Sequence, residues 1–340
     1  MFDITVARTM GPGSVEMTTR SFPVLKSGEV CVRVEAAGIC GSDIAIYKGD
    51  FASRIELPCV LGHEWSGTVV DVADDVTRVQ PGDRVVSEEI FSCGDCDPCR
   101  QGHFDYCVQP EELGFTVDGA HASHVVLPAR YCHVIPDTVS FEAAAMVEPL
   151  GVAYNAIYHA GPGIAPGQRV FVSGLGPIGL SAGLWAKASG AEVIGIEQRP
   201  FRCELAAKMG FHDVVQVGEN FDALRELGPG DMLVEASGDH RVVGAMLSNI
   251  NPKGAVVTVG HTTKPVEIWL EPVTLKGLTV VGSIGQIGAN SYPRMLHALE
   301  IGAVDPTPMI THRFALADAP QAMHLASTSE EFAKILFTVF

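Results

Sequence analysis

The feature that most constrains the fold is a glycine-rich turn, GLGPIG, at residues 174–179. It follows a short apolar run at residues 169–173 and precedes a run of small and apolar residues at 180–189. This order predicts a strand, a tight turn and a helix. In that context G-x-G-x-x-G is the fingerprint of a dinucleotide-binding βαβ unit, whose helix N-terminus faces a pyrophosphate. A plain structural turn rich in glycine is the alternative.

Each glycine of the turn has a separate expected role. Gly174 makes the tight turn, Gly176 lets the pyrophosphate approach the backbone, and Gly179 permits close packing of helix on strand. The acidic residue that often ends the next strand is present as Glu197, 18 residues after Gly179. A carboxylate there binds an adenosine ribose and repels a 2′-phosphate, so we expect NAD rather than NADP. Arg199 and Arg202 lie close enough in sequence to keep NADP as the alternative.

The sequence around the turn continues the alternation of strands and helices. Short apolar strands are expected at residues 192–196, 232–235, 255–259 and 278–281, and a further helix at 201–209. This alternation predicts an α/β domain with a doubly wound parallel sheet over residues 150–285. Residues 1–149 contain instead short alternating strands separated by turns, for example at residues 29–36 and 84–87. We therefore expect a β-rich domain there, completed by residues 286–340.

Four of the nine cysteines form a cluster with the spacing C-x2-C-x2-C-x7-C: Cys93, Cys96, Cys99 and Cys107. Four closely spaced thiolates suit a tetrahedral Zn²⁺, and a site closed by four protein ligands is structural. An iron–sulfur cluster uses similar ligands and is the alternative. The first residues lack the basic and apolar stretches of a signal peptide, so we expect a cytoplasmic protein whose clustered cysteines bind metal.

The charge of the chain restricts its partners. It has 40 acidic and 23 basic residues, a formal net charge of −17. The cysteine lobe, residues 88–118, contains eight carboxylates and a single basic residue, Arg100. This excess of negative charge disfavours nucleic acid and anionic membranes as partners. The uncharged stretches at residues 170–186 and 277–293 are shorter than the roughly 20 apolar residues of a membrane span.

Three further residues have the chemistry of a second metal site. Cys40, His63 and Glu148 offer a thiolate, an imidazole and a carboxylate, which together suit a catalytic zinc with its fourth position open. They lie on distant segments, so their spacing does not show that they converge. A buried free cysteine, a core histidine and a glutamate at a helix start are the alternatives.

The chain resembles the zinc-dependent medium-chain alcohol and polyol dehydrogenases along nearly its whole length. Besides the glycine turn and the cysteine lobe, the matching segments are GICGSD (38–43), LGHEWSGTV (61–69), PGDRV (81–85), VEPLGVAYNAI (147–157) and ITHRF (310–314). The Glu-Pro-Leu segment is most similar to the sorbitol dehydrogenase branch, where a glutamate takes the place of a zinc-binding cysteine. The resemblance implies a GroES-like catalytic domain joined to a Rossmann domain.

The resemblance also implies roles for particular residues. Cys40, His63 and Glu148 would hold the catalytic zinc, and Glu64 would be a close neighbour that binds the ion directly, exchanges with water or lies behind the ligands. Ser42 would start a proton relay, although the histidine that often continues it is replaced by Ala45. Water, another side chain or the substrate would then complete the relay. The cofactor would contact Gly174, Gly176, Pro177, Ile178, Gly179, Glu197, Arg202, Val259, Gly260, Ser283 and Ile284.

We therefore expect an enzyme with one catalytic and one structural zinc that reversibly oxidises a secondary hydroxyl with NAD. A polyol, cyclitol or sugar-derived alcohol is the expected substrate. An amino alcohol, L-threonine or butanediol is the alternative, and a non-catalytic binding protein is the remaining class. No motif identifies the residues that line the substrate pocket. The candidates are Tyr47, Phe51, Phe115, His121 and Ser283. The resemblance further implies a homodimer or, more often, a homotetramer.

Overall fold

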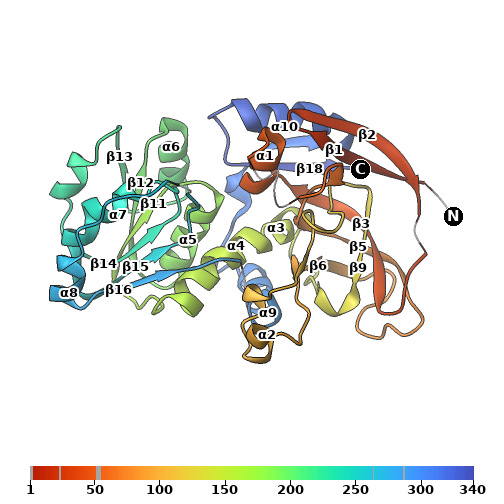
Figure 1. Ribbon diagram of the computed structural model, residues 1–340, viewed down its shortest axis with the longest axis horizontal. Coiled ribbons are helices and arrows are strands. Elements are labelled where there is room, and N and C mark those ends of the chain that lie inside the picture. Colours follow the sequence, from red (N-terminus) through yellow and green to blue (C-terminus); the bar gives the residue numbers. More distant parts are fainter. Residues whose placement is uncertain (1–2, 23, 51–54, 263, 286–287) are drawn as a thin grey trace. The chain divides into compact units, whose positions relative to one another are not determined.

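The computed structural model (Figure 1) describes residues 3–22, 24–50, 55–262, 264–285 and 288–340. They group into two compact units. The first comprises Met1–Glu148, Ile287–Gly302 and Ile310–Phe340, and the second Pro149–Gln286 and Ala303–Met309. We expected residues 303–309 in the first domain. They group with the second unit, where Val304 and Pro308 border the same hollow as Leu184 and Met209.

The first unit is built on a seven-stranded sheet centred on β3 (Glu29–Gly38). Strand β3 pairs antiparallel with β5 (Glu64–Val72), β9 (His124–Pro128) and β18 (Lys334–Val339). Arg33 is its one exposed residue, as befits a central strand. The other strands of this sheet are β6 (Arg84–Ser87), β10 (Cys132–Val134) and β17 (Ile310–Ala315).

Smaller elements complete the first unit. A three-stranded sheet contains β1 (Asp3–Gly11), β2 (Ser14–Ser21) and β4 (Cys59–Val60), and a ribbon pairs β7 (Ile90–Phe91) with β8 (Glu111–Glu112). Its helices are α1 (Gly41–Lys48), α2 (Asp97–Arg100), α3 (Phe141–Ala145), α9 (Gly288–Glu300) and α10 (Ala319–Thr328). Helix α1 follows β3 after two residues, and Gly49 ends it with a φ of 91°.

The second unit contains the parallel sheet that the sequence predicts. Its order is β13 (Asp213–Gln216), β12 (Glu192–Glu197), β11 (Arg169–Ser173), β14 (Gly230–Glu235), β15 (Ile250–Thr258) and β16 (Thr279–Gly282). Helices α5 (Pro177–Ala188), α6 (Pro200–Lys208), α7 (Arg241–Met246) and α8 (Glu271–Lys276) lie between strands in the chain and flank the sheet (Figure 1). The strand order reverses direction between β11 and β14, which is the topological switch point of a doubly wound sheet.

The chain passes from the first unit to the second within helix α4 (Val147–Tyr154), between Glu148 and Pro149. A short π-helical segment, Asn155–Ala160, follows. None of the helices in the described ranges is long and apolar enough to cross a membrane.

Candidate functional site

The pairing of β3 with β5 brings together two of the expected ligands. Gly38 lies opposite Glu64 in this antiparallel pair. Cys40 follows β3 and His63 precedes β5, so both side chains come to the same end of the sheet. Ligand atoms of Cys40, His63 and Glu64 all lie within 4.8 Å of one another.

His63 also belongs to a second group, with Glu89 and Glu148. Ligand atoms of these three residues likewise lie within 4.8 Å of one another. Glu148 is buried in the first turn of α4, and Glu89 follows β6 with its Oε2 3.8 Å from His63 Nε2. The structure thus places His63 in two groups, one with Cys40 and Glu64 and one with Glu148 and Glu89, the last of which no motif indicates.

Asp43 is a second residue that the sequence analysis missed. It is fully buried, and its Oδ2 accepts a hydrogen bond from the backbone N–H of Cys40 at 2.8 Å. Its Oδ1 lies 4.0 Å from His63 Nδ1, and neither atom has a hydrogen-bond partner in the described part of the chain. A carboxylate behind a ligating histidine orients the ring. The available signal was the acid three residues after Cys40, the spacing that caps a helix start.

Burial and charge together suit this cluster to a divalent cation. Burial raises the pKa of Glu148 well above its usual value, and the charge of Glu89 raises it further. Burial alone would lower the pKa of His63, but Cys40 and Glu89 outweigh it and raise that pKa well above its usual value. A bound dication would offset this concentration of negative charge. The donor set of thiolate, imidazole and carboxylate fits zinc.

The other residues expected near the cluster differ in their burial and in their contacts. The Oγ of Ser42 is buried and has no hydrogen-bond partner among the described residues. Phe115 stacks on His63 with ring centroids 5.1 Å apart. His121 is buried with Nε2 3.0 Å from the carbonyl oxygen of Gly38, so that nitrogen is already engaged. Of the remaining pocket candidates, Tyr47 is buried and Phe51 lies outside the described residues.

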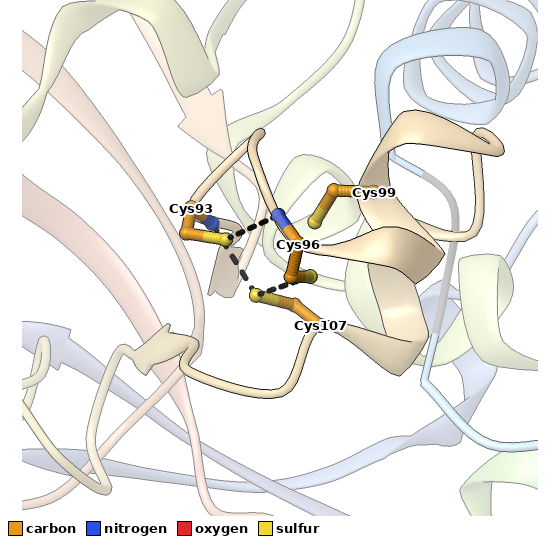
Figure 2. Close-up of side chains that lie close together, drawn as sticks. All are labelled: Cys93, Cys96, Cys99 and Cys107. Atoms are coloured by element: carbon orange, nitrogen blue, oxygen red, sulfur yellow. Dashed lines mark hydrogen bonds between the residues drawn. The ribbon is translucent and has the colours of Figure 1, made fainter.

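The four clustered cysteines point toward one another (Figure 2), with their sulfurs all within 4.8 Å. Backbone N–H groups of Asp95 and Cys96 donate to Cys93 Sγ at 3.5 and 3.4 Å. Backbone N–H groups of Val108 and Cys99 lower the pKa of Cys96 to about 6. Such donors stabilise thiolates, the form in which cysteine binds metal. The lobe therefore fits a four-coordinate ion.

The expected cofactor residues gather at the carboxyl ends of the parallel strands. The glycine turn follows β11 and Glu197 ends β12, while the other expected residues follow β15 and β16: Val259, Gly260, Ser283 and Ile284. Because parallel strands end at one edge of the sheet, residues more than a hundred positions apart share that edge. The side chain of Asn155 supports the last of these segments by donating to Ser283 Oγ at 3.4 Å and to the carbonyl oxygen of Ile284 at 3.3 Å.

Glu197 is bound tightly into the turn. Its Oε2 accepts from the backbone N–H of Leu175 at 2.8 Å. Its Oε1 accepts from the N–H groups of Gln198 and Arg199 at 2.7 and 3.0 Å. A Cβ on Gly176 would lie 3.4 Å from Arg202 Nη1, so this guanidinium lies beside the turn. The turn is thus held by a carboxylate and bordered by a cation.

Strand β14 ends at a further buried acid that the motifs did not indicate, Glu235. Its Oε1 accepts from the backbone N–H groups of Ser237 and Gly238 at 2.7 and 3.0 Å. Its backbone carbonyl accepts from the N–H groups of Val259 and Gly260 at 2.8 and 2.9 Å. Glu235 therefore fixes the loops after two neighbouring strands at the edge where the cofactor residues gather.

Comparison with known families matches both halves of the chain. Residues 26–137 match the family model of the alcohol dehydrogenase GroES-like domain. Residues 177–300 match the family model of zinc-binding dehydrogenases. The first match falls on the β-rich part of the chain, and the second covers most of the parallel-sheet part and helix α9.

Curated relatives and solved structures extend over nearly the whole chain. An L-threonine 3-dehydrogenase from Bacillus licheniformis is 35% identical over 312 residues, 89% of each chain. A protein described as a short chain alcohol dehydrogenase of Escherichia coli, complexed with NADH, has a TM-score of 0.90 at 28% identity, covering 99% of each chain. Galactitol-1-phosphate dehydrogenase from Escherichia coli has a TM-score of 0.90 at 25% identity, covering 98% of this chain and 99% of its own. A zinc-binding dehydrogenase of Sinorhizobium meliloti bound to NADP scores 0.91 at 26%, covering 99% and 100%.

Proposed function

This chain belongs to the zinc-dependent medium-chain alcohol dehydrogenase family, and from that premise we propose that it oxidises a secondary hydroxyl of a small polar substrate reversibly. The observation that supports the proposal is the position of His63 in two overlapping groups of ligand atoms, one with Cys40 and Glu64 and the other with Glu89 and Glu148. Asp43 lies behind the histidine. The hydride acceptor is a nicotinamide dinucleotide.

The metal ligands follow from the donor set. Cys40, His63 and Glu148 would hold the catalytic zinc, with Glu64 beside them as a further ligand or a close neighbour. Four cysteines would hold the structural zinc: Cys93, Cys96, Cys99 and Cys107. When bound, the catalytic ion lowers the pKa of a hydroxyl that it coordinates. Asp43 orients His63 through Nδ1 and holds the backbone of Cys40. Ser42 would relay the hydroxyl proton, because its Oγ can accept that proton while its own O–H proton passes on. Ala45 cannot receive the released proton, so water, another side chain or the substrate would complete the transfer.

The dinucleotide would bind at the carboxyl edge of the parallel sheet. Gly174 and Gly176 leave room for the pyrophosphate, and the start of α5 faces it. A nicotinamide dinucleotide held at this edge would supply the hydride acceptor. The buried carboxylate of Glu197 supports NAD over NADP, although Arg202 beside Gly176 gives a 2′-phosphate a counter-charge. We therefore propose NAD as the preferred cofactor.

For the substrate, we place β-hydroxy amino acids such as L-threonine, and related amino alcohols, first. The curated L-threonine 3-dehydrogenases that resemble the chain support this class. This reverses the order suggested by the Glu-Pro-Leu motif. Polyols and sugar-derived alcohols remain the second candidate, supported by that motif at Glu148 and by the similarity to galactitol-1-phosphate dehydrogenase.

The test combines metal content with a substrate panel. Purified protein should contain two zinc ions per chain and reduce NAD with L-threonine or an amino alcohol faster than with sorbitol or butanediol. Glu148→Ala should lose activity and one zinc ion. Glu142→Ala is the control, because the Glu142 carboxylate pairs with Arg313 instead. This variant should keep its activity and both zinc ions. Full activity and zinc content in Glu148→Ala would contradict the proposed ligand, and higher activity on sorbitol would favour the second substrate class.

We further propose that the chain assembles with copies of itself through strand β16. This strand is an edge of the parallel sheet, and Val280 on it is 48% exposed. Nearby Trp269, Leu270, Leu275 and Ile284 are also exposed. An unpaired apolar edge strand is a ready site for pairing with another strand. Two copies related by a two-fold axis would each pair their β16 edge with that of the other. The resulting dimer could then assemble into a tetramer.

A further inference from the structure

Asn155 is a buried residue of the second unit that bonds to the loop after strand β16. It is 3% exposed, and its Nδ2 lies 3.4 Å from Ser283 Oγ and 3.3 Å from the carbonyl oxygens of both Ile284 and Gly285. A backbone carbonyl oxygen only accepts hydrogen bonds, so the amide nitrogen of this side chain, and not its oxygen, must face the loop. Its two N–H groups are shared among the three acceptors.

The backbone makes an unusual turn at this residue. Asn155 is the first residue of the π-helical segment Asn155–Ala160 that follows α4. Such π-turns are rare and are found frequently at functional sites. The segment packs against β15 and β16, and just after it a Cβ on Gly161 would lie 3.0 Å from Val257 Cγ2. The wide turn therefore lies directly beside the strand whose following loop Asn155 holds.

The loop after β16 leaves the sheet one residue beyond the strand. The backbone N–H of Ser283 donates to the carbonyl oxygen of Thr258 at 2.9 Å, which continues the pairing of β16 with β15. Beyond it, Ile284 is 47% exposed, and Gly285 has a φ of 58°, in the left-handed region that favours glycine. The carbonyl groups of both residues accept from Asn155. One buried side chain thus holds the backbone of an exposed turn from behind.

The position of this loop in the sheet determines which half of a dinucleotide it can serve. The glycine turn follows β11, and Glu197, which is expected to bind the adenosine ribose, ends β12 on one side of it. Strand β16 lies on the other side, beyond β14 and β15. A dinucleotide binds across the switch point of such a sheet, with one mononucleotide half on each side. The loop after β16 is therefore on the side of the nicotinamide half.

From this geometry we propose that Asn155 is a positioning residue for the nicotinamide half of the cofactor, acting through the backbone of residues 283–285. The proposal deepens the proposed function and rests on it, because it requires a nicotinamide dinucleotide at this edge. A loop whose conformation is fixed before binding loses little freedom when the cofactor arrives. Holding this loop should therefore strengthen the binding of the nicotinamide half and leave the adenosine half unaffected.

The test compares NADH with ADP-ribose, which lacks the nicotinamide ring. Asn155→Asp keeps the shape of the side chain but replaces the N–H donors with an oxygen that repels the loop carbonyls. We expect the Kd for NADH to rise about tenfold, as loss of two hydrogen bonds would cause, and the Kd for ADP-ribose to stay within about twofold of wild type. Calorimetric titration measures both constants. The fluorescence of bound NADH should also shift toward that of free NADH, because the ring is held less firmly.

Asn249→Asp is the matched control in the same unit. The Nδ2 of Asn249 also donates to two backbone carbonyl oxygens, those of Leu224 and Leu227, but this residue precedes β15 and so lies at the amino edge of the sheet. The control variant loses the same kind of bonds, so we expect lower stability against denaturant together with wild-type affinity for both ligands. If Asn155→Asp does not fold, Asn155→Ala, which removes the donors without adding a charge, takes its place with the same expectation.

Two outcomes would overturn the proposal. One is wild-type affinity for NADH in the Asn155 variant. The other is an equal loss of affinity for NADH and for ADP-ribose, because Asn155 would then serve only the fold of the unit. A wild-type protein that binds neither ligand would instead overturn the proposed function.

Discussion

At the scale of single residues, Asp43 offers the clearest test of how the catalytic site is organised. Its carboxylate holds the backbone of Cys40 and faces His63 Nδ1, yet it belongs to neither group of converging ligand atoms. We expect Asp43→Asn to keep the fold and to weaken zinc binding at the catalytic site by about 10–100-fold, as loss of a histidine-orienting carboxylate does. Competition with a chromogenic chelator measures this affinity, and the cysteine lobe should keep its ion.

Asp83→Asn is the matched control. Its carboxylate also accepts from the backbone N–H three residues earlier, that of Gln80, but in an exposed turn. This variant should bind two zinc ions with wild-type affinity. Equal zinc affinity in both variants would show that Asp43 only caps helix α1.

The role of a residue could be predicted from the sequence where a short segment around it contains the pattern that reveals the role. The four lobe cysteines lie within 15 residues, so their spacing alone predicts a shared ion. Cys40, His63 and Glu148 needed a family resemblance, because they lie on segments that are far apart in the sequence, two beside strands and one on helix α4. Lys334, whose buried ammonium pairs with the carboxylate of Glu64, is 270 residues from it, and no local pattern distinguishes it from a surface lysine. Only the pairing of β18 with β3 places it.

At the scale of elements, the turn between β11 and α5 is limited by space. A Cβ on Gly179 would lie 1.8 Å from the carbonyl oxygen of Gly174, which is backbone and cannot move aside cheaply. We expect Gly179→Ala to lower the free energy of unfolding by about 1–3 kcal/mol, the usual cost of overpacking. Dinucleotide affinity should fall with it, because α5 would be pushed away from the strand. Chemical denaturation and titration with NADH measure both effects.

Gly218 provides a control in the same unit. A Cβ there would meet nothing within 4 Å. Gly218→Ala should therefore change stability by no more than about 0.5 kcal/mol. If Gly179→Ala were as stable as this control and bound NADH equally well, close packing at the turn would not be required.

The elements of the second unit were easier to predict than those of the first. Strands such as β11 are buried apolar runs between glycine turns, so their type and their succession along the chain could be predicted. Strand β13, which has no buried residue, was not predicted. Strand β2, by contrast, has no fully buried residue, and its sequence SVEMTTRS offers only Val15 and Met17, which pack partly buried against the core, as an apolar face. It is defined by its pairing with β1, a tertiary contact. The π-helical segment after α4 likewise had no sequence signal.

At the scale of the whole molecule, the two edges of the parallel sheet differ in chemistry. Strand β13 carries Asp213 and Gln216 at exposed positions, whereas β16 carries the exposed Val280. Charged residues on an edge discourage pairing with another strand. We therefore expect β16, rather than β13, to be the edge that pairs with a second copy.

Val280→Lys tests this assignment. A lysine on β16 would have to be desolvated between two copies, so we expect the variant to be monomeric, near the chain mass of 36.1 kDa, while the wild type has at least twice that mass. Light scattering coupled to size-exclusion chromatography measures the mass, and circular dichroism checks that the fold is kept. Gln216→Lys on the opposite edge should leave the mass unchanged. A wild type that is monomeric, or a Val280→Lys protein with wild-type mass, would exclude β16 as the contact, and the exposed side chains around α8 would then need another explanation.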